Sequence, residues 1–204
     1  IQHFRTHCWS SSTGATTTSA PAREVIFLTG PCGCGKSTAA QALAQRFEIP
    51  VIEGDNLHSP AAREKMAKGI PLEDRDRWDW LAHIRGAVMD RLQQTTAPAI
   101  AVTCSALRTV YRDQLRQLSQ LLDFPVTVTF LLLSVHDRET LKKRMVERLA
   151  KEEHYMRSTM VDSQLDILEE PRLSEGDVII VNAGQNKAQM LQQVEETVRG
   201  LLKA

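Results

Sequence analysis

One motif, Gly30-Pro-Cys-Gly-Cys-Gly-Lys36-Ser37, constrains this chain more than any other part of its sequence. It fits the phosphate-binding pattern G-x-x-x-x-G-K-[ST]. An apolar run of strand type at 24–29 precedes the motif, and a run of helix formers at 38–46 follows it. Such a strand, glycine loop and helix start direct backbone N–H groups and the positive end of a helix into one concave site. The sequence therefore predicts a binding site for a nucleoside triphosphate.

The residues of this phosphate loop are expected to contact the nucleotide. Lys36 would reach the β- and γ-phosphates, and the Ser37 hydroxyl would bind Mg²⁺. Cys32 and Cys34 have two interpretations, because nearby amides and Lys36 favour a reactive thiolate, whereas two small side chains filling a tight turn would be inert. The predicted nucleotide-binding residues are Gly30, Pro31, Cys32, Gly33, Cys34, Gly35, Lys36, Ser37 and Thr38.

Length and composition narrow the class of protein. The 204 residues suffice for one α/β domain, and the equal numbers of basic and acidic residues, 25 of each, give no global basic field for nucleic acid. No apolar run reaches the roughly 18–20 residues that span a membrane. The four cysteines are too scattered for a disulfide framework. We therefore expect reduced thiols, a cytoplasmic location, and neither nucleic acid nor membrane as a partner.

The first 21 residues differ in composition from the rest of the chain. Ser and Thr dominate 10–19, and the first acidic residue is Glu24. This composition is typical of a disordered tail, while the presence of Arg5 and the lack of acids also fit the remnant of an organelle transit segment. We expect a disordered Ser/Thr-rich tail over 1–21 and one folded domain over 22–204.

From residue 22 onward, strand-like and helix-like segments alternate. Apolar runs with β-branched residues predict five strands buried on both faces, at 24–29, 50–53, 99–104, 126–133 and 177–182. Helical patterns lie between and after them, starting at Ser59-Pro60 and then covering about 78–92, 111–122, 138–150 and 187–202. Trp78, Trp80 and the methionines have core-like spacing. The alternation predicts an α/β fold with a doubly wound, five-stranded parallel sheet that binds ligands at the carboxyl ends of its strands.

Two acidic residues follow the second predicted strand, close to the phosphate loop. Asp55 could accept the proton of a substrate hydroxyl and orient it for in-line attack, while Glu53 could hold a water on Mg²⁺. The sequence Glu-Gly-Asp-Asn is also typical of a solvated turn. The third predicted strand ends in Thr103-Cys-Ser105, where the two hydroxyl residues could cap the next helix. A Walker-B Asp is therefore absent, which argues against motor ATPases and GTPases.

Two groups of basic residues could face bound anions. Arg144 and Arg148 lie four residues apart on one helical face, in a segment that also contains His154. This segment is either a solvated helix or a mobile lid that closes over the nucleotide and stabilises charge on the transferred phosphoryl group. The second group follows Asp55 and could bind an anionic acceptor; its members are His58, Arg63, Lys65, Arg75 and Arg77.

Residues 24–183 resemble the gluconokinases, a family in the shikimate-kinase-like group of P-loop kinases. Each short motif is weak alone, and the order and spacing of the motifs make the match specific. The motifs are Gly30 to Thr38, Glu53-Gly-Asp-Asn-Leu-His58, Lys65-Met-Ala-Lys-Gly-Ile-Pro-Leu72, Asp74 to Leu81, Cys104-Ser-Ala-Leu107, Tyr111-Arg-Asp113, His154-Tyr-Met, Gln164-Leu165 and Leu168-Glu-Glu-Pro171.

The resemblance implies a P-loop kinase domain over 22–204 with a mobile helical lid. Such a kinase would transfer the γ-phosphoryl group of ATP, with Mg²⁺, to a hydroxyl of D-gluconate and give 6-phospho-D-gluconate. Together with the residue patterns above, it assigns catalysis to Lys36, Asp55 and Arg144, further ATP contacts to Arg144 and Arg148, and metal binding to Ser37 and Glu53. The substrate contacts would be Asp55, His58, Arg63, Arg77 and His154, and a guanidinium such as Arg77 would pair with the gluconate carboxylate.

The chain departs from the family pattern in three places. Glu53 stands where an Asp is usual, Asp79 stands where a Pro is common, and the lid has additional residues at 149–153. A nucleoside monophosphate kinase, or another small-molecule P-loop kinase, remains the alternative enzyme. The expected partner is a small molecule, and the chain could form a homodimer.

Overall fold

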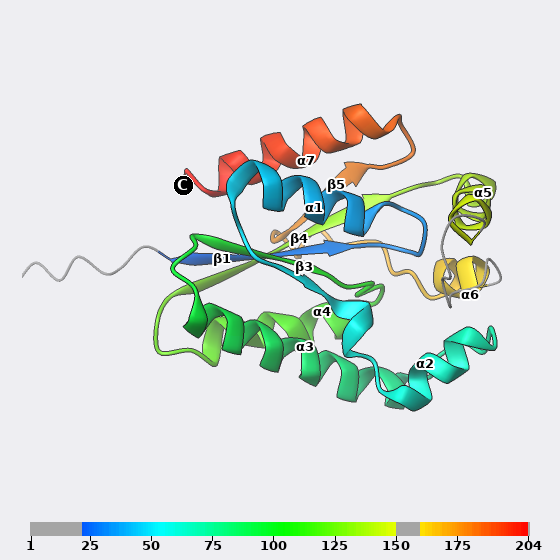
Figure 1. The fold of residues 1–204 in the computed structure, drawn as a ribbon, viewed down its shortest axis with the longest axis horizontal. Helices are drawn as coiled ribbons and strands as arrows, with labels where there is room; N and C mark the ends of the chain where they lie inside the picture. Colours follow the sequence, from blue (N-terminus) through cyan, green and yellow to red (C-terminus); the bar gives the residue numbers. More distant parts are fainter. Residues whose placement is uncertain (1–21, 150–159, 204) are drawn as a thin grey trace, which may run out of the picture.

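A five-stranded parallel sheet lies at the centre of the fold (Figure 1). The computed structural model describes residues 22–149 and 160–203. The strands are β1 (Arg23–Thr29), β2 (Val51–Glu53), β3 (Ala99–Thr103), β4 (Val126–Ser134) and β5 (Val178–Asn182). They are arranged in the order β2-β3-β1-β4-β5, and every neighbouring pair is parallel. The strand that leads into the phosphate loop is therefore the central one.

Helices cover both faces of this sheet. They are α1 (Lys36–Phe47), α2 (Pro60–Ala67), α3 (Asp74–Gln94), α4 (Thr109–Arg116), α5 (Arg138–Leu149), α6 (Met160–Asp166) and α7 (Lys187–Leu201), with the 3₁₀ turns η1 (Gly54–Leu57) and η2 (Gln117–Gln120). Helices α1 and α7 cover one face, and α3 and α4 cover the other (Figure 1). Helices α2, α5 and α6 lie beyond the carboxyl ends of the strands (Figure 1). The predicted α/β doubly wound fold is confirmed.

Alternate residues of β1 point to opposite faces of the sheet and enter two hydrophobic clusters. Ile26 and Leu28 pack in one cluster with Leu43 of α1. Val25 and Phe27 pack in the other cluster, which contains the apolar face of α3. All four β1 side chains are fully buried, which explains why this strand has a continuous apolar run rather than an alternating one.

The predicted strand boundaries agree with the structure to within one residue at each end. Ser59 caps α2 as predicted, since its side chain accepts a hydrogen bond from the Ala62 N–H at 3.1 Å. Helix α6 was not predicted, and the helix expected over 111–122 changes to 3₁₀ geometry after Arg116. The prediction that Trp78 packs in the core is wrong, because Trp78 is 40% exposed, whereas Trp80 is buried.

Some predictions fall on residues outside this description. They are the disordered tail over 1–21, the domain boundary that it defines, His154, and the additional lid residues 150–153. Within 22–149 and 160–203, the structure contains no helix with the length and apolar character needed to cross a membrane.

Candidate active site

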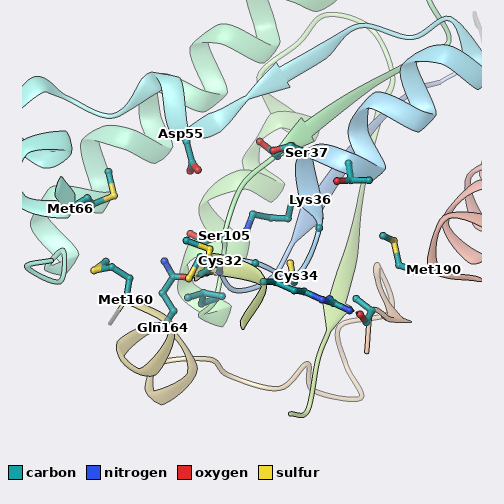
Figure 2. Close-up of a pocket in the computed structure, with 18 of the residues that line it drawn as sticks. Cys32, Cys34, Lys36, Ser37, Asp55, Met66, Ser105, Met160, Gln164 and Met190 are labelled. Carbon is teal, nitrogen blue, oxygen red and sulfur yellow. Dashed lines mark hydrogen bonds between the residues drawn. The ribbon is translucent and has the colours of Figure 1, made fainter. Parts of the chain in front are cut away.

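A cavity of about 650 Å³ opens at the carboxyl ends of the strands. Its walls come from the phosphate loop, from the η1 turn, from six of the helices, and from residues that follow β3 and β5 (Figure 2). This is where open α/β sheets bind their ligands. The cavity brings together predicted site residues that are far apart in the sequence: Cys32, Gly33, Cys34, Gly35, Lys36, Ser37, Thr38, Asp55, His58, Arg77 and Arg144.

The phosphate loop depends on glycine where the backbone turns out of β1. Gly30 has a φ of +127°, and a Cβ at this position would lie 2.8 Å from the carbonyl oxygen of Leu133. The Lys36 ammonium donates hydrogen bonds to the carbonyl oxygens of Gly30 and Pro31, both at 2.9 Å. Gly30 and Pro31 themselves are buried behind the cavity lining. The loop thus holds its own lysine over the space where phosphates would bind.

A hydroxyl and carboxylate network joins the start of α1 to the ends of β2 and β3. Ser37 Oγ donates to Glu53 Oε2 at 3.2 Å, and Thr103 Oγ1 donates to the same oxygen at 2.6 Å. A hydroxyl and a carboxylate are oxygen donors of the type that Mg²⁺ prefers beside nucleotide phosphates. The donor chemistry therefore fits the metal role predicted for Ser37 and Glu53.

Thr103 also holds the turn that carries Asp55. Its Oγ1 accepts a hydrogen bond from the Gly54 N–H at 3.2 Å. The alternative in which Thr103 or Ser105 caps the next helix is wrong, because α4 begins at Thr109 with Arg108 as its N-cap. The sequence gives no direct signal for this role, since the bond joins residues 49 positions apart.

Asp55 lies in η1 and faces the cavity. Trp80 Nε1, from α3, donates to the Gly54 carbonyl at 2.7 Å and anchors the turn. A Cβ on Gly54 would lie 2.2 Å from the Thr103 carbonyl oxygen, so the turn lies directly against β3. Figure 2 shows the Asp55 carboxylate and the Lys36 side chain extending into the same space. The turn predicted from Glu-Gly-Asp-Asn therefore exists, and it directs its acid into the cavity.

His58 is buried beneath the same turn and lines the cavity. Its ring stacks on Trp80, with centroids 4.3 Å apart and an angle of 9° between the planes. Burial lowers the His58 pKa to about 4, against the opposing effect of Asp55, so the ring is neutral near pH 7. Its Nδ1 is buried and has no hydrogen-bond partner among the described residues. The prediction that grouped His58 with the basic residues is wrong in its charge, and the ring can instead exchange a hydrogen bond with a neutral polar group.

Arg77 lines the cavity from the first turns of α3, and its side chain is only 12% exposed. It donates to the Tyr111 hydroxyl at 3.4 Å, and Tyr111 in turn donates to Asp74 at 2.6 Å. Arg108 also contacts Asp74, at 2.8 Å. The hydrogen bond from Tyr111 lowers the pKa of Asp74. Arg77 is thus a guanidinium held at the cavity wall by a network on α3 and α4.

The other predicted basic contacts on this side do not line the cavity. Arg63 is exposed on α2. Lys65 is paired with Asp76 at 2.7 Å, and Arg75 is paired with Glu73 at 2.7 Å. The helix pattern of this segment could not separate these residues from Arg77, because all of them are long, charged side chains near a surface. In this conformation, Arg77 is the one of these four basic residues that reaches the cavity.

Arg144 enters the cavity from α5. It donates to the carbonyl oxygen of Ala183, the residue after β5, at 2.9 Å. The buried Leu141 and Met145 pack the same helix against the core cluster. Arg148 belongs to α5, and His154 lies outside the described residues. The base of the predicted lid is therefore a half-buried helix rather than a fully solvated one.

The loop cysteines have the environment of inert thiols. Burial raises the pKa of Cys32 to about 11, and it also raises the pKa of Cys34; in both cases Lys36 opposes this effect. Because the thiolate is the reactive form, the structure contradicts the interpretation of Cys32 and Cys34 as activated nucleophiles. The alternative, two small residues that fill a tight turn, fits their burial.

Several lining residues were missed as site residues by the sequence analysis. Gln164 of α6 accepts a hydrogen bond from the Cys32 N–H at 2.7 Å. Four buried methionines, one on each of four helices, also line the cavity: Met66 on α2, Met145 on α5, Met160 on α6 and Met190 on α7. The Gln164-Leu165 pair of the family pattern was a signal that could have identified Gln164. The methionines were interpreted only as packing residues.

Comparisons with known proteins agree with this geometry. A family model described as an AAA domain matches residues 25–171. A probable gluconokinase of Schizosaccharomyces pombe is 40% identical over 185 residues, covering 91% of this chain and 93% of that protein. The gluconokinase of Arabidopsis thaliana is 34% identical over 72% of this chain and 78% of that protein. A crystal structure of a gluconokinase from Sinorhizobium meliloti superposes with a TM-score of 0.69 at 34% identity, covering 91% of this chain and 95% of that one.

These similarities extend over both ends of the cavity. The match to the Schizosaccharomyces pombe protein covers nine-tenths of both chains, and the AAA-domain match runs from β1 to beyond α6. The phosphate loop, the Asp55 turn, and the segment of α3 that carries Arg77 all lie within residues 25–171. The chain belongs to the gluconokinase family of P-loop kinases, which are phosphotransferases with an alcohol group as acceptor.

Proposed function

We propose that this protein transfers the γ-phosphoryl group of ATP to a hydroxyl of D-gluconate, giving 6-phospho-D-gluconate and ADP. The observation that carries the proposal is the placement of Lys36, Asp55 and Arg77 around one cavity. The three side chains supply a phosphate partner, a proton acceptor and a carboxylate partner. The gluconokinase names of the relatives support the choice of acceptor.

The phosphate end of the cavity would bind ATP. The first amides of α1 have no partners within the helix, so they are available to phosphate oxygens. The Lys36 ammonium has three N–H donors, so it would keep its bond to the Pro31 carbonyl and turn its other donors, including the one now on Gly30, towards the β- and γ-phosphates. Arg144, and Arg148 one turn further along α5, would add positive charge as negative charge spreads over the transferred group.

Asp55 would act as the proton acceptor. The acceptor oxygen forms a bond to the γ-phosphorus, and the bond between that phosphorus and the bridging oxygen of ADP breaks. The electron pair leaves with ADP, and the hydroxyl proton passes to a carboxylate oxygen of Asp55. The bonds that hold the Gly54 turn to Trp80 and Thr103 support this role, because they fix the direction of the carboxylate.

Ser37 and Glu53 would hold Mg²⁺, which neutralises phosphate charge when it is bound. Ser37 Oγ donates to Glu53 Oε2, so binding of the ion would replace this hydrogen bond. Glu53 stands where the family usually has Asp, and its carboxylate would hold a water on the ion. Thr103 would keep its bond to Glu53 and preserve the direction of the carboxylate.

The acceptor would lie between the η1 turn and α3. The Arg77 guanidinium offers two parallel N–H groups to a carboxylate. The neutral His58 would bond a sugar hydroxyl through its Nδ1, which has no partner among the described residues. Arg63 and His154 remain candidate substrate contacts by family resemblance. Arg63 would have to approach from the exposed face of α2.

An acceptor panel tests the proposal. Release of ADP would be measured with ATP, Mg²⁺ and, in turn, D-gluconate, shikimate and AMP, and the product would be identified by ³¹P NMR. Of the three acceptors, we expect only D-gluconate to support turnover, and its product should carry a phosphate ester on the terminal hydroxyl. Phosphorylation of AMP with no reaction on gluconate would reject the proposal in favour of a nucleoside monophosphate kinase.

A further inference from the structure

Gln164 contacts the phosphate loop although it lies more than 120 residues further along the chain. Gln164 is only 8% exposed, and its side chain lines the cavity beside Cys32 (Figure 2). The Cys32 N–H donates to Gln164 Oε1 at 2.7 Å. Because a backbone N–H can only donate, the oxygen of the carboxamide must face the loop.

The bonded N–H belongs to the same peptide unit that holds the proposed phosphate-binding lysine. The carbonyl oxygen of Pro31 accepts a hydrogen bond from Lys36 Nζ at 2.9 Å, and the N–H of that peptide unit is the Cys32 N–H. A peptide unit is planar, so its C=O and N–H groups turn together. Fixing the N–H therefore fixes the direction of the carbonyl that receives Lys36.

Helix α6 is in turn anchored to its surroundings, so Gln164 can act as a fixed support. Asp162 pairs with Arg138 at 2.9 Å and with Lys142 at 3.2 Å, which ties α6 to α5. Met160 and Val161 are buried in the cluster that contains Cys32. The α6 backbone thus has both polar and apolar contacts that hold it against the loop.

The chain is also fixed after α6, on the side of the cavity near Arg77. The Glu169 N–H donates to the Leu107 carbonyl at 2.8 Å. The Glu169 carboxylate accepts from the Thr109 N–H at 2.8 Å and from Arg108 Nε at 3.0 Å. Residues 164–169 therefore bridge the phosphate loop and the start of α4.

We propose that Gln164 is a positioning residue: by holding the Cys32 N–H it orients the Pro31–Cys32 peptide unit and, through its carbonyl, the Lys36 ammonium. Removal of the acceptor leaves a buried N–H without its partner, and the peptide unit gains freedom to turn. The Lys36 ammonium then points towards the phosphate-binding part of the cavity for a smaller fraction of the time. The inference depends on the proposed kinase reaction only for its kinetic test.

The test combines amide exchange with kinetics in three variants. Gln164→Leu removes the acceptor oxygen at similar size, Gln164→Glu keeps an acceptor oxygen, and Gln192→Leu makes the same chemical change on the exposed face of α7. Hydrogen exchange of the Cys32 amide would be followed by NMR in the nucleotide-free protein. We expect about a tenfold or greater loss of protection in Gln164→Leu, retention in Gln164→Glu, and no change in Gln192→Leu, in line with the cost of an unpaired buried N–H.

The kinetic arm follows turnover. We expect kcat to fall about tenfold in Gln164→Leu while the KM for the acceptor changes less than twofold, because the defect lies at the phosphate end. Gln164→Met replaces the leucine variant if that variant does not fold. Unchanged Cys32 protection, or kinetics equal to those of Gln192→Leu, would overturn the proposal. The exchange result does not depend on which acceptor the enzyme uses, so a failure of the gluconate assignment is distinguishable from a failure of this inference.

Discussion

At the phosphate end of the cavity, the backbone of one continuous loop forms the site, whereas the acceptor end is formed by side chains from separate elements. Gly30 and Lys36 belong to a single run of seven residues. Asp55, His58 and Arg77 reach the other end from η1, the residue after it, and α3. A contiguous loop can be recognised from sequence, and a site assembled from distant side chains depends on packing. The two ends should therefore respond differently to substitution.

The largest expected effect comes from Asp55→Asn at the acceptor end. The change keeps the shape of the side chain and removes the proton acceptor, so kcat should fall by about 10²–10⁴-fold. Binding of ATP, measured by calorimetry, should stay within a few-fold of the wild type because the phosphate loop is untouched. A variant with nearly normal kcat would show that another group accepts the proton.

Gly54→Ala tests a place where the acceptor end depends on backbone geometry. The new Cβ would lie 2.2 Å from the Thr103 carbonyl oxygen, so the turn that carries Asp55 must move. We expect a loss of about 3 kcal/mol in the free energy of unfolding, measured with urea, and a fall in kcat. Gly86→Ala in α3 is the matched control, because nothing lies within 4 Å of its Cβ position. The control should be neutral or stabilised by up to about 1 kcal/mol, since alanine favours helix.

His58 should make folding stability depend on pH below neutrality. Its folded pKa of about 4 lies below the ordinary value of 6.5, so the unfolded chain binds the proton first on acidification. The contribution of the neutral ring is complete above pH 6.5 and is lost as the pH falls towards 4, by about 3 kcal/mol in all. The charged groups around the ring are Asp55, Arg77, Arg63 and Asp76.

The comparison variant for this pH effect is His58→Phe, which can keep the stacking on Trp80. Between pH 7 and 4 its unfolding free energy, from urea titrations, should fall less steeply than that of the wild type. His83→Gln, on the exposed face of α3, should follow the wild-type curve. Parallel curves for the wild type and His58→Phe would mean that the ring is not held neutral.

Arg77→Lys separates charge from geometry at the acceptor wall. Lysine keeps the positive charge and loses the planar fork, so we expect the KM for D-gluconate to rise about tenfold with a smaller fall in kcat. The KM for ATP should be unchanged. An equal rise in both KM values would mean that the two ends are not separate sites of recognition.

The smallest effect is expected from the thiols of the phosphate loop. With the pKa of Cys32 raised to about 11 by burial, little thiolate is present at pH 7, so moderate peroxide should leave kcat unchanged. A Cys32→Ser, Cys34→Ser double variant should lose activity over time at the same rate as the wild type. Rapid inactivation of the wild type, prevented in the double variant, would contradict this expectation.

The same contrast explains how far the sequence could predict the molecule. The strands and the phosphate loop are local patterns, since continuous apolar runs and fixed glycine spacing identify them without tertiary information. Helical periodicity could not select Arg77 over Arg63, because the choice depends on which face of each helix meets the cavity; the family resemblance favoured Arg77. Cys32 was ambiguous for a related reason, since burial and the charge of Lys36 act in opposite directions and only packing decides between them.

Residue pairs that are distant in sequence were the least predictable. Thr103 is hydrogen-bonded to Glu53, 50 positions away in the sequence, and Cys32 is hydrogen-bonded to Gln164, 132 positions away. Each of these residues is an ordinary polar or small residue in its own segment. Their roles follow from the parallel sheet, which gathers the ends of distant strands at one edge.

The four methionines make one part of the cavity lining adaptable, whereas the loop and turn that carry Lys36 and Asp55 are fixed. Each of helices α2, α5, α6 and α7 contributes one unbranched thioether side chain to the lining. The turn that carries Asp55 is instead held by backbone hydrogen bonds to Thr103 and Trp80. Three rotatable bonds allow such side chains to fill or vacate space at little cost. Incoming substrate and departing product can therefore be accommodated by rotamer changes, with the helices themselves in place. NMR of methyl-labelled methionine would report these rotamer changes at four positions around the cavity.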